Sequence, residues 1–269
     1  MMNLDSFTFI KGESPLLISI PHDGRKLLPD MSSRMTQEGL ILPDTDWNIN
    51  ELYKFSRQMD ICLISADYSR YVVDLNRSVD DSALYKNHIS TGLFPEKTFS
   101  GKNIYKSLKG INSQDIEQRI SSFWSPYHKK IHKILNEKKA KYGYALLWDA
   151  HSIKTFVPDL FEGRLPDLNI GTNSGETCPK IIEDAVLNIA LRSRYSVVSN
   201  ERFKGGFITR NYGNPKNHIY AIQLEIAQSC YMDETSLTYN TESAKKLIIT
   251  LEKMLKAFML TAKKINFKN

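Results

Sequence analysis

The sequence has 269 residues, of which 41% are hydrophobic and 25% are charged, enough for one sizeable core of ordinary globular composition. No run of about 18 apolar residues occurs, which excludes a transmembrane helix, and residues 1–15 lack the regions of a signal peptide. The net charge of +6 favours anionic ligands, but many lysines fall on predicted helix surfaces, so the charge alone does not indicate nucleic-acid binding.

The three cysteines, Cys62, Cys178 and Cys230, form no CxxC pair. An odd number without that spacing argues against a disulfide framework and against a cysteine-bound structural zinc. We therefore expect reduced thiols and a cytoplasmic location.

Apolar runs and 3.6-residue periodicity predict short strands that alternate with longer helices. In chain order, we expect a strand at 16–20, a helix at 46–59, strands at 61–66 and 71–75, a helix at 113–141 that breaks near Pro126, a strand at 144–148, a helix at 179–192, strands at 195–199 and 220–226, and an amphipathic helix at 241–264.

This alternation predicts a single α/β domain over residues 1–269. Its core would be a mainly parallel, twisted mixed sheet with helices on both faces. Residues 80–110 and 156–175 are rich in loop-forming residues and show little periodicity. Long irregular segments of this kind are often functional, so we expect both to be loops beside a site.

Chemically capable side chains stand at or near the carboxyl ends of the predicted strands. His22 follows the first strand, Arg77 follows 71–75, His151 follows 144–148, and Glu225 lies within the last strand. In open α/β sheets ligands bind outside the carboxyl ends of the strands. The four side chains are thus expected to converge on one crevice.

Two histidines and a carboxylate form a suitable ligand set for catalytic zinc. The common HxxE spacing is absent because Arg25 stands three residues after His22. Asp46 is the carboxylate candidate for the third ligand. Its alternative role is a helix N-terminal acid beside a Thr45 cap. Asp149, two residues before His151, is a candidate for orienting that imidazole.

Glu225 interrupts an otherwise apolar strand. Burial would raise its pKa toward the range that is useful for proton transfer, and a buried ion pair is the alternative explanation. His128 and His132 have i, i+4 spacing but are surrounded by lysines, which is more typical of a surface helix than of a metal site. His88 and His218 lie in polar loops. No GxSxG, P-loop or GxGxxG motif occurs.

Several long motifs in a fixed order resemble the N-formylglutamate amidohydrolases (N-formylglutamate deformylases) over residues 18–234. They are Ser-Ile-Pro-His-Asp-Gly at 19–24, Asp-Thr-Asp-Trp at 44–47, Ser-Arg-Tyr-Val-Val-Asp-Leu-Asn-Arg at 69–77, Asp-Ala-His-Ser-Ile at 149–153, Leu-Pro-Asp-Leu-Asn-Ile-Gly-Thr at 165–172, Arg-Phe-Lys-Gly-Gly-Phe-Ile-Thr-Arg at 202–210 and Gln-Leu-Glu-Ile at 223–226.

The resemblance implies an α/β fold related to zinc carboxypeptidases, one Zn²⁺ per chain, and cleavage of N-formyl-L-glutamate to formate and L-glutamate in histidine degradation. By the same resemblance, His22 and His151 match the zinc histidines and Glu225 the catalytic glutamate. Asn76 and Arg77 look like the pair that holds a substrate carboxylate in carboxypeptidases.

The sequence departs from the family pattern at Asp23, where serine is expected, and at Asn211, where histidine is common. The first departure adjoins a candidate ligand and could tune the metal. The second removes a possible polar contact to the substrate. Both departures bear on the identity of the substrate and not on the type of reaction.

A dianionic substrate requires a second cation besides Arg77, and Arg210 and Arg70 are the candidates. For Arg70 the alternative is a structural pair with Asp67 or Asp74. We expect a small acidic N-acyl amino acid as the partner, no nucleic acid, no membrane, and a monomer or small homo-oligomer. Competing functions are a zinc deacylase for another N-acyl amino acid and a non-catalytic anion- or RNA-binding relative.

Overall fold

A seven-stranded sheet forms the centre of the structure, a computed structural model that describes residues 6–81, 92–107 and 113–266. The strand order is β1-β3-β2-β4-β7-β5-β6. Four neighbouring pairs are parallel (β2–β3, β2–β4, β4–β7 and β5–β6), and β1–β3 and β5–β7 are antiparallel. The strands are β1 (Phe7–Ile10), β2 (Leu16–Ile20), β3 (Cys62–Ala66), β4 (Ala145–Ile153), β5 (Leu168–Gly171), β6 (Val197–Ser199) and β7 (Ile219–Ala227), with a separate pair of β8 (Met232–Asp233) and β9 (Thr238–Tyr239).

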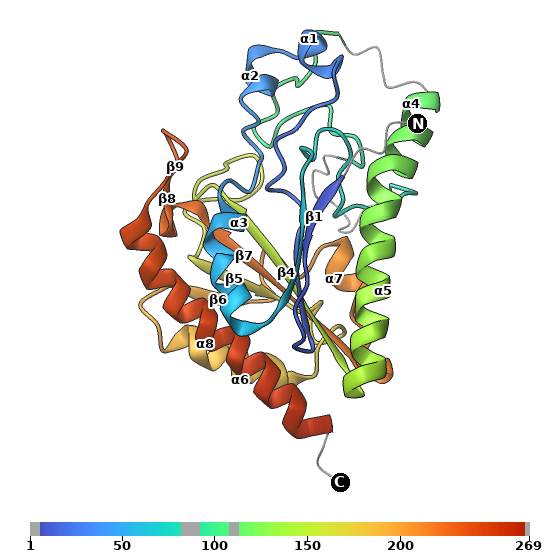
Figure 1. Cartoon of the computed structure of the whole chain (residues 1–269). Helices are drawn as coiled ribbons and strands as arrows, with labels where there is room; N and C mark the ends of the chain where they lie inside the picture. The colour runs from blue at the N-terminus through green and yellow to red at the C-terminus, as the bar shows by residue number, and fades with distance from the viewer. Residues whose placement is uncertain (1–5, 82–91, 108–112, 267–269) are drawn as a thin grey trace.

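Helices cover both faces of this sheet. The long helices α6 and α8 pack together on one side, and α5 lies on the other (Figure 1). The α-helices are α1 (Met31–Arg34), α2 (Gln37–Leu40), α3 (Ile49–Leu52), α4 (Ser113–Arg119), α5 (Ser125–Tyr142), α6 (Lys180–Leu191), α7 (Phe207–Tyr212) and α8 (Thr241–Asn266). The other helical segments are the 3-10 turns η1 (Tyr53–Met59), η3 (Pro215–Asn217) and η4 (Gln228–Cys230) and the π-turn η2 (Ile120–Trp124).

Alternate residues of the central strands enter two separate cores. In β2, Leu16, Ile18 and Ile20 pack toward α6 and α8, whereas Leu17 packs toward α5. All five residues of the strand are buried. A strand that is covered on both faces reads as a continuous apolar run. The predicted mainly parallel α/β sheet with helices on both faces is therefore confirmed.

The predicted strand at 71–75 is wrong. This segment follows turns, in which Val72 N donates to Ser69 O and Arg77 N donates to Asp74 O. Its apolar side chains are buried without a strand ladder, and β1 already occupies the free edge of β3. The apolar residues of 71–75 are therefore explained by their burial in the core and do not indicate a strand.

Two other segments depart from expectation. The strand predicted at 144–148 continues as β4 to Ile153, so His151 lies inside the strand rather than after it. The loop expected at 156–175 contains β5, which pairs with β7 and β6. A further strand, β1, precedes the first one predicted. Of the loop expected at 80–110, residues 82–91 and 108–110 lie outside the described residues, and 92–107 form no helix or strand.

The helix expected at 46–59 is a short α3 followed by the 3-10 segment η1. The helix expected at 113–141 is interrupted at 120–124 by the π-turn η2, and Pro126 stands in the first turn of α5. Ser125 N donates to Ile120 O across this turn, and the backbone stays helical through it. The hydrogen-bond pattern therefore changes just before Pro126, but the helical run does not break there as predicted.

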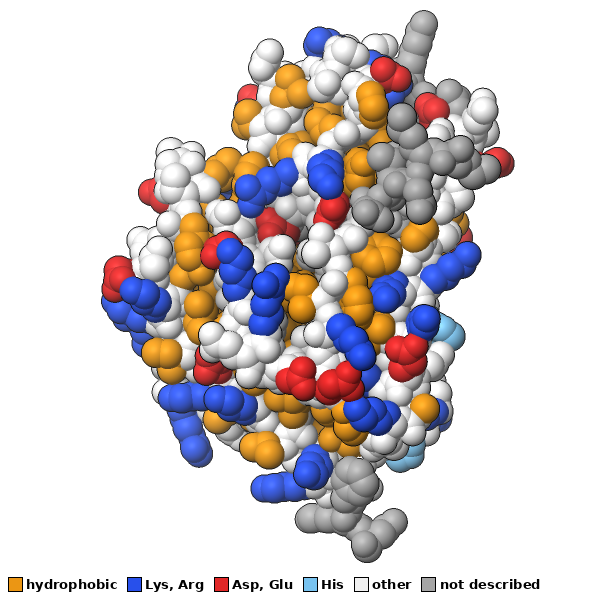
Figure 2. All heavy atoms as spheres, viewed as in Figure 1, with side chains coloured by type: hydrophobic (Ala, Val, Ile, Leu, Met, Phe, Trp, Pro, Cys, Tyr) orange, Lys and Arg blue, Asp and Glu red, His pale blue; other side chains and the backbone are white. Residues whose placement is uncertain are grey.

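Charged side chains of both signs are scattered over the face drawn in Figure 2, with hydrophobic side chains between them. The positive charge does not gather into one patch on that face. Among the described residues, no helix is both long and apolar enough to cross a membrane.

Candidate metal centre

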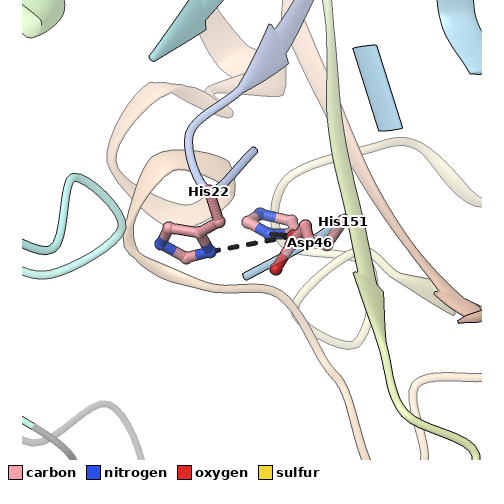
Figure 3. Close-up of side chains that lie close together, drawn as sticks. All are labelled: His22, Asp46 and His151. Atoms are coloured by element: carbon pink, nitrogen blue, oxygen red, sulfur yellow. Dashed lines mark hydrogen bonds and ion pairs between the residues drawn. The ribbon is translucent and has the colours of Figure 1, made fainter. Parts of the chain in front are cut away.

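Three side chains from separate parts of the chain meet beside the carboxyl ends of β2 and β4 (Figure 3). His22, Asp46 and His151 each offer one ligand atom, and these atoms all lie within 4.8 Å of one another. Asp46 Oδ2 lies 3.1 Å from His151 Nδ1 and 3.8 Å from His22 Nδ1. All three side chains are buried. One ion could contact all three, so they form the candidate metal centre.

Backbone contacts fix Asp46 between the two histidines. Asp46 N donates to His22 O at 3.0 Å, and Ser152 N donates to Asp46 Oδ2 at 3.1 Å. Because β2 and β4 are parallel neighbours, with Ser19 opposite Asp149, the two histidines reach the same edge of the sheet. The sheet topology thus places His22 and His151 close together although more than 100 residues separate them in the sequence.

The alternative role of Asp46, as an acid at the start of a helix, belongs to Asp23 instead. The two carboxylate oxygens of Asp23 accept hydrogen bonds from Asn48 N (3.1 Å) and Asn50 N (2.9 Å) at the start of α3. Asp46 accepts from His151 and Ser152. The carboxylate of Asp46 is therefore directed at the histidines and not at the helix.

Asp74 holds the far side of the His22 ring. Its Oδ1 lies 2.7 Å from His22 Nε2, and its Oδ2 accepts from Arg70 Nη2 at 2.5 Å. Sequence reasoning assigned Asp74 only as a partner of Arg70 and missed its contact with His22. The sequence did offer one indication of a role for Asp74: like Glu225, it is a carboxylate within an apolar segment. The pairing of Arg70 with Asp74 agrees with the structural alternative for Arg70.

Asp149 lies behind His151 in the same way. Its Oδ1 is 3.2 Å from His151 Nε2, and its Oδ2 accepts from Thr209 Oγ1 at 3.0 Å. Carboxylates behind metal-binding imidazoles fix ring orientation and make the ligand nitrogen more basic. Both histidines thus present Nδ1 toward Asp46 and turn Nε2 toward a buried carboxylate.

Glu225 stands beside this group on the neighbouring strand. It is opposite His151 in the parallel β4–β7 register, so both side chains lie on the same face of the sheet. Burial raises the pKa of Glu225 to about 8, and His151 opposes part of that shift. Among the described residues, no side chain forms an ion pair with the Glu225 carboxylate. The alternative explanation of Glu225 as half of a buried ion pair therefore finds no support in that part of the chain.

The electrostatics of the centre favour a cation. Burial lowers the pKa of His22 below its ordinary value. Burial acts in the same direction on His151, but the carboxylates of Asp149 and Asp46 outweigh it and hold the pKa of His151 well above the ordinary range. The negative charge of Asp149 and Asp46 favours a proton on His151, and a bound metal ion would neutralise the same charge. Two imidazoles and one carboxylate form a donor set that fits catalytic Zn²⁺.

Asn76 lies against His151 and joins it to α7. Its Nδ2 is 3.1 Å from His151 Nε2, and its Oδ1 accepts from Ile208 N at 2.8 Å. Arg77 follows directly and is half-buried. Arg210 is on α7, where its Nε donates to Gly205 O at 2.7 Å. Asn76 therefore lies on the Nε2 side of His151, and Arg210 belongs to the helix that Asn76 contacts.

The remaining histidines do not join the centre. His128 is buried, contrary to the surface position that we expected, and contacts Tyr212 Oη and Leu75 O at 2.9 Å each. His132 and His218 are exposed, and His88 lies outside the described residues. Asn211, the second departure from the family pattern, is also exposed.

Comparison with known proteins points to one family. The family model described as N-formylglutamate amidohydrolase matches residues 14–232. A protein of Pseudomonas aeruginosa named N-formylglutamate deformylase is 43% identical over 254 residues, which cover 94% of this chain and 95% of that protein. A Pseudomonas putida protein of the same name is 41% identical over the same shares of the two chains.

Solved structures share the fold. The crystal structure of N-formylglutamate amidohydrolase from Ralstonia eutropha superposes with a TM-score of 0.82 at 21% identity, covering 94% of this chain and 98% of that one. A gene product of Agrobacterium tumefaciens superposes with a TM-score of 0.72 at 16% identity, covering 94% and 96%.

Proposed function

Since the chain belongs to the N-formylglutamate amidohydrolase family, we propose that it hydrolyses N-formyl-L-glutamate to formate and L-glutamate, a step of histidine degradation. One Zn²⁺ would be held by His22, Asp46 and His151. The observation that carries this proposal is the buried cluster of these three side chains with Glu225 opposite His151. Membership of the family supports this reaction, and the buried cluster supports these residue roles.

Bound zinc would supply Lewis acidity toward the formyl oxygen and would lower the pKa of water to about 7. Glu225 is the proton carrier. It takes a proton from the attacking water and passes it to the leaving amine, so one carboxylate serves as base and then as acid. A raised pKa suits both steps, because the group must hold the proton between them.

Arg77 binds a carboxylate of the substrate through paired N–H donors. Asn76, whose amide contacts His151 and Ile208, keeps the adjacent backbone in place. The second carboxylate of a dianionic substrate requires another cation, for which Arg210 and Arg70 are the candidates. Arg70 is already paired with Asp74, which leaves its other N–H groups for such a contact.

The test of the proposed function is formate release from N-formyl-L-glutamate, with and without a chelator, in the wild type and in Glu225→Gln. We expect Glu225→Gln to retain zinc and to lose roughly 10²- to 10⁴-fold in kcat, the usual contribution of a general acid–base group. Glu242→Gln, on the exposed start of α8, is the matched control. Wild-type turnover in Glu225→Gln would refute the assigned role.

A further inference from the structure

Asn169 lies beside Glu225, on the side away from His151. In the sheet, Asn169 of β5 is opposite Glu225 of β7, and Glu225 is opposite His151 of β4. Residues that are directly opposite each other on antiparallel strands carry their side chains on one face, with Cβ atoms roughly 5 Å apart. The three residues therefore form one row across three neighbouring strands, with Glu225 in the middle.

This row projects from the face of the sheet that carries the candidate metal centre. The strand neighbours of Asn169 and Glu225 pack into the core shared with α6 and α8; they are Leu168, Ile170, Leu224 and Ile226. Because successive side chains of a strand alternate between the two faces, Asn169 and Glu225 project from the opposite face, as His151 does. Asn169 is thus a neighbour of the proposed proton carrier on the reacting side of the sheet.

Two hydrogen bonds fix the orientation of the Asn169 amide. Its Nδ2 donates to Pro166 O at 2.7 Å and to Glu225 O at 3.2 Å. Both acceptors are backbone carbonyl oxygens, so the NH₂ end of the amide must face them, since the Oδ1 end has no hydrogen to offer. The side chain of Asn169 is therefore anchored on the backbone of Glu225, with its oxygen turned away from both carbonyls.

The Oδ1 atom of Asn169 is buried, and no donor in the described part of the chain reaches it. A buried oxygen without a donor costs free energy, so native proteins keep few of them. Asn169 is only 1% exposed, so bulk solvent does not supply the donor either. A donor that arrives with a ligand accounts for this oxygen.

The proposed reaction brings an N–H group to this place. Glu225 passes its proton to the leaving nitrogen, so that nitrogen must come within hydrogen-bond reach of the Glu225 carboxyl group. The nitrogen of a formyl amide also carries a hydrogen of its own, which needs an acceptor in a buried site. Of the two row neighbours of Glu225, His151 belongs to the candidate metal centre, whereas Asn169 has an acceptor without a donor.

We propose that Asn169 Oδ1 accepts the N–H of the scissile amide and, once the C–N bond has broken, an N–H of the leaving amine. Asn169 is then a substrate-binding residue that holds the nitrogen so that its lone pair faces the proton on Glu225. This inference rests on the proposed function, because it uses Glu225 as the proton carrier. It also gives a role to the motif at 165–172, which the proposed function does not use.

The first experiment compares N-formyl-L-glutamate with the formate ester of L-2-hydroxyglutarate, in which an oxygen replaces the N–H. Both substrates are assayed with the zinc-loaded wild type and with Asn169→Ala. We expect the variant to lose roughly 3- to 10-fold more kcat/KM for the amide than for the ester, the usual net effect of one neutral hydrogen bond. Equal losses for the two substrates would overturn the proposal, because Asn169 would then act only on Glu225 or on the fold.

Two further variants separate the acceptor from a structural role. Asn169→Asp keeps an oxygen at this position but loses both Nδ2 contacts, so it should lower stability and activity while keeping the amide-to-ester ratio of the wild type. Asn200→Ala is the matched control, because the Asn200 amide oxygen accepts from Thr172 N and Ser174 N just after β5. It should lower stability and leave the ratio unchanged. A ratio that shifts equally in Asn200→Ala and Asn169→Ala would contradict the proposal.

A measurement on the wild type alone covers the case in which Asn169→Ala does not fold. Two inhibitors carry a tetrahedral phosphorus in place of the reacting carbon, one joined to the glutamate skeleton through N–H and the other through oxygen. We expect the N–H compound to bind roughly 3- to 10-fold more tightly, and equal affinities would overturn the proposal. Absence of formate release from N-formyl-L-glutamate would instead refute the proposed function, whereas equal affinities with normal formate release would refute only this inference.

Discussion

At the scale of single residues, the two histidines of the candidate metal centre are each held by a carboxylate behind the ring. Asp74 and Asp149 hold the Nε2 atoms of His22 and His151, and both carboxylates are fully buried. Burying a carboxylate is costly unless it is paired. Asp74 is hydrogen-bonded to His22 and Arg70, and Asp149 lies 3.2 Å from His151 Nε2 and accepts a hydrogen bond from Thr209. These contacts leave both Nδ1 atoms directed toward Asp46.

Asp149→Asn tests this arrangement. The substitution keeps the size of the side chain and its contact with Thr209, but removes the charge behind His151. We expect zinc affinity to fall by roughly 10- to 100-fold, the usual effect of losing such a partner. Competition with a chromophoric chelator measures it, and Asp233→Asn, on an exposed turn, is the control. Unchanged affinity would contradict an orienting role for Asp149.

Arg77→Ala tests the binding of the substrate carboxylate. A hydrogen bond to a charged group contributes about 1.5–3 kcal/mol, so we expect kcat/KM to fall by roughly 10- to 150-fold, mainly through a higher KM. Arg77→Lys should recover part of the loss, because lysine keeps the charge but lacks the paired donors. If both variants keep the wild-type KM, the carboxylate is bound elsewhere.

Asp23, one of the two departures from the family pattern, has a structural role at the start of α3. Its two oxygens accept from two backbone amides at the start of α3, those of Asn48 and Asn50. A serine has only one side-chain oxygen and could not bridge both donors in this way. The carboxylate therefore ties the loop after His22 to the segment that follows Asp46.

At the scale of secondary-structure elements, α5 carries a buried histidine that ties it to the loop before Arg77. His128 Nε2 lies 2.9 Å from Leu75 O, and the Trp124 ring stacks on the imidazole at a centroid distance of 3.9 Å. Trp124 Nε1 in turn donates to Arg77 O at 2.9 Å. The helix thus supports the segment that carries Asn76 and Arg77.

This burial makes a prediction about pH. Burial lowers the pKa of His128 to about 4, whereas an unfolded histidine has a pKa of about 6.5. Between these values the unfolded chain binds the proton and the folded chain does not, so stability falls as the pH falls through that window. Between pH 7 and pH 4.5 the contribution is about 2 kcal/mol.

The measurement is the free energy of unfolding in urea at both pH values for the wild type and His128→Gln. The variant should lose about 2 kcal/mol less than the wild type on acidification, because it lacks the titrating group. His132→Gln, an exposed position on the same helix, is the matched control. Equal acid sensitivity of His128→Gln and the wild type would refute the prediction.

At the scale of the whole molecule, the candidate metal centre brings together parts of the chain that are distant in sequence. His22 follows β2, Asp46 precedes α3 and His151 lies in β4. An ion that binds only when these parts are assembled stabilises the folded state. At a free zinc concentration 1,000 times its dissociation constant, the gain is about 4 kcal/mol.

We therefore expect a chelator to lower the free energy of unfolding by about 4 kcal/mol relative to zinc-saturated enzyme, and added zinc to restore both stability and activity. Denaturant unfolding with and without the chelator measures this. His22→Ala, which removes one ligand, should lose most of the response to zinc. A chelator that leaves stability and turnover unchanged would contradict a bound metal.

The sequence by itself determined the class of the fold and most of its long elements. The strands at 16–20 and 220–226 and the helices at 179–192 and 241–264 were predicted within about two residues of β2, β7, α6 and α8. These elements have strong hydrophobic patterns because they are buried on one stripe or on both faces. Ordered motifs also identified the family, and the two histidines and Glu225 as site candidates.

The tertiary structure alone decided which residues meet. Local pattern could not separate a strand at 71–75 from a buried loop, because both bury the same apolar side chains. It also could not choose between two roles for Asp46, or reveal that Asp74 lies behind His22. Each of these depends on the order β3-β2-β4-β7 in the sheet, which brings side chains from separate strands to one edge. Contacts across strands are long-range pairings, and no single stretch of sequence contains both partners.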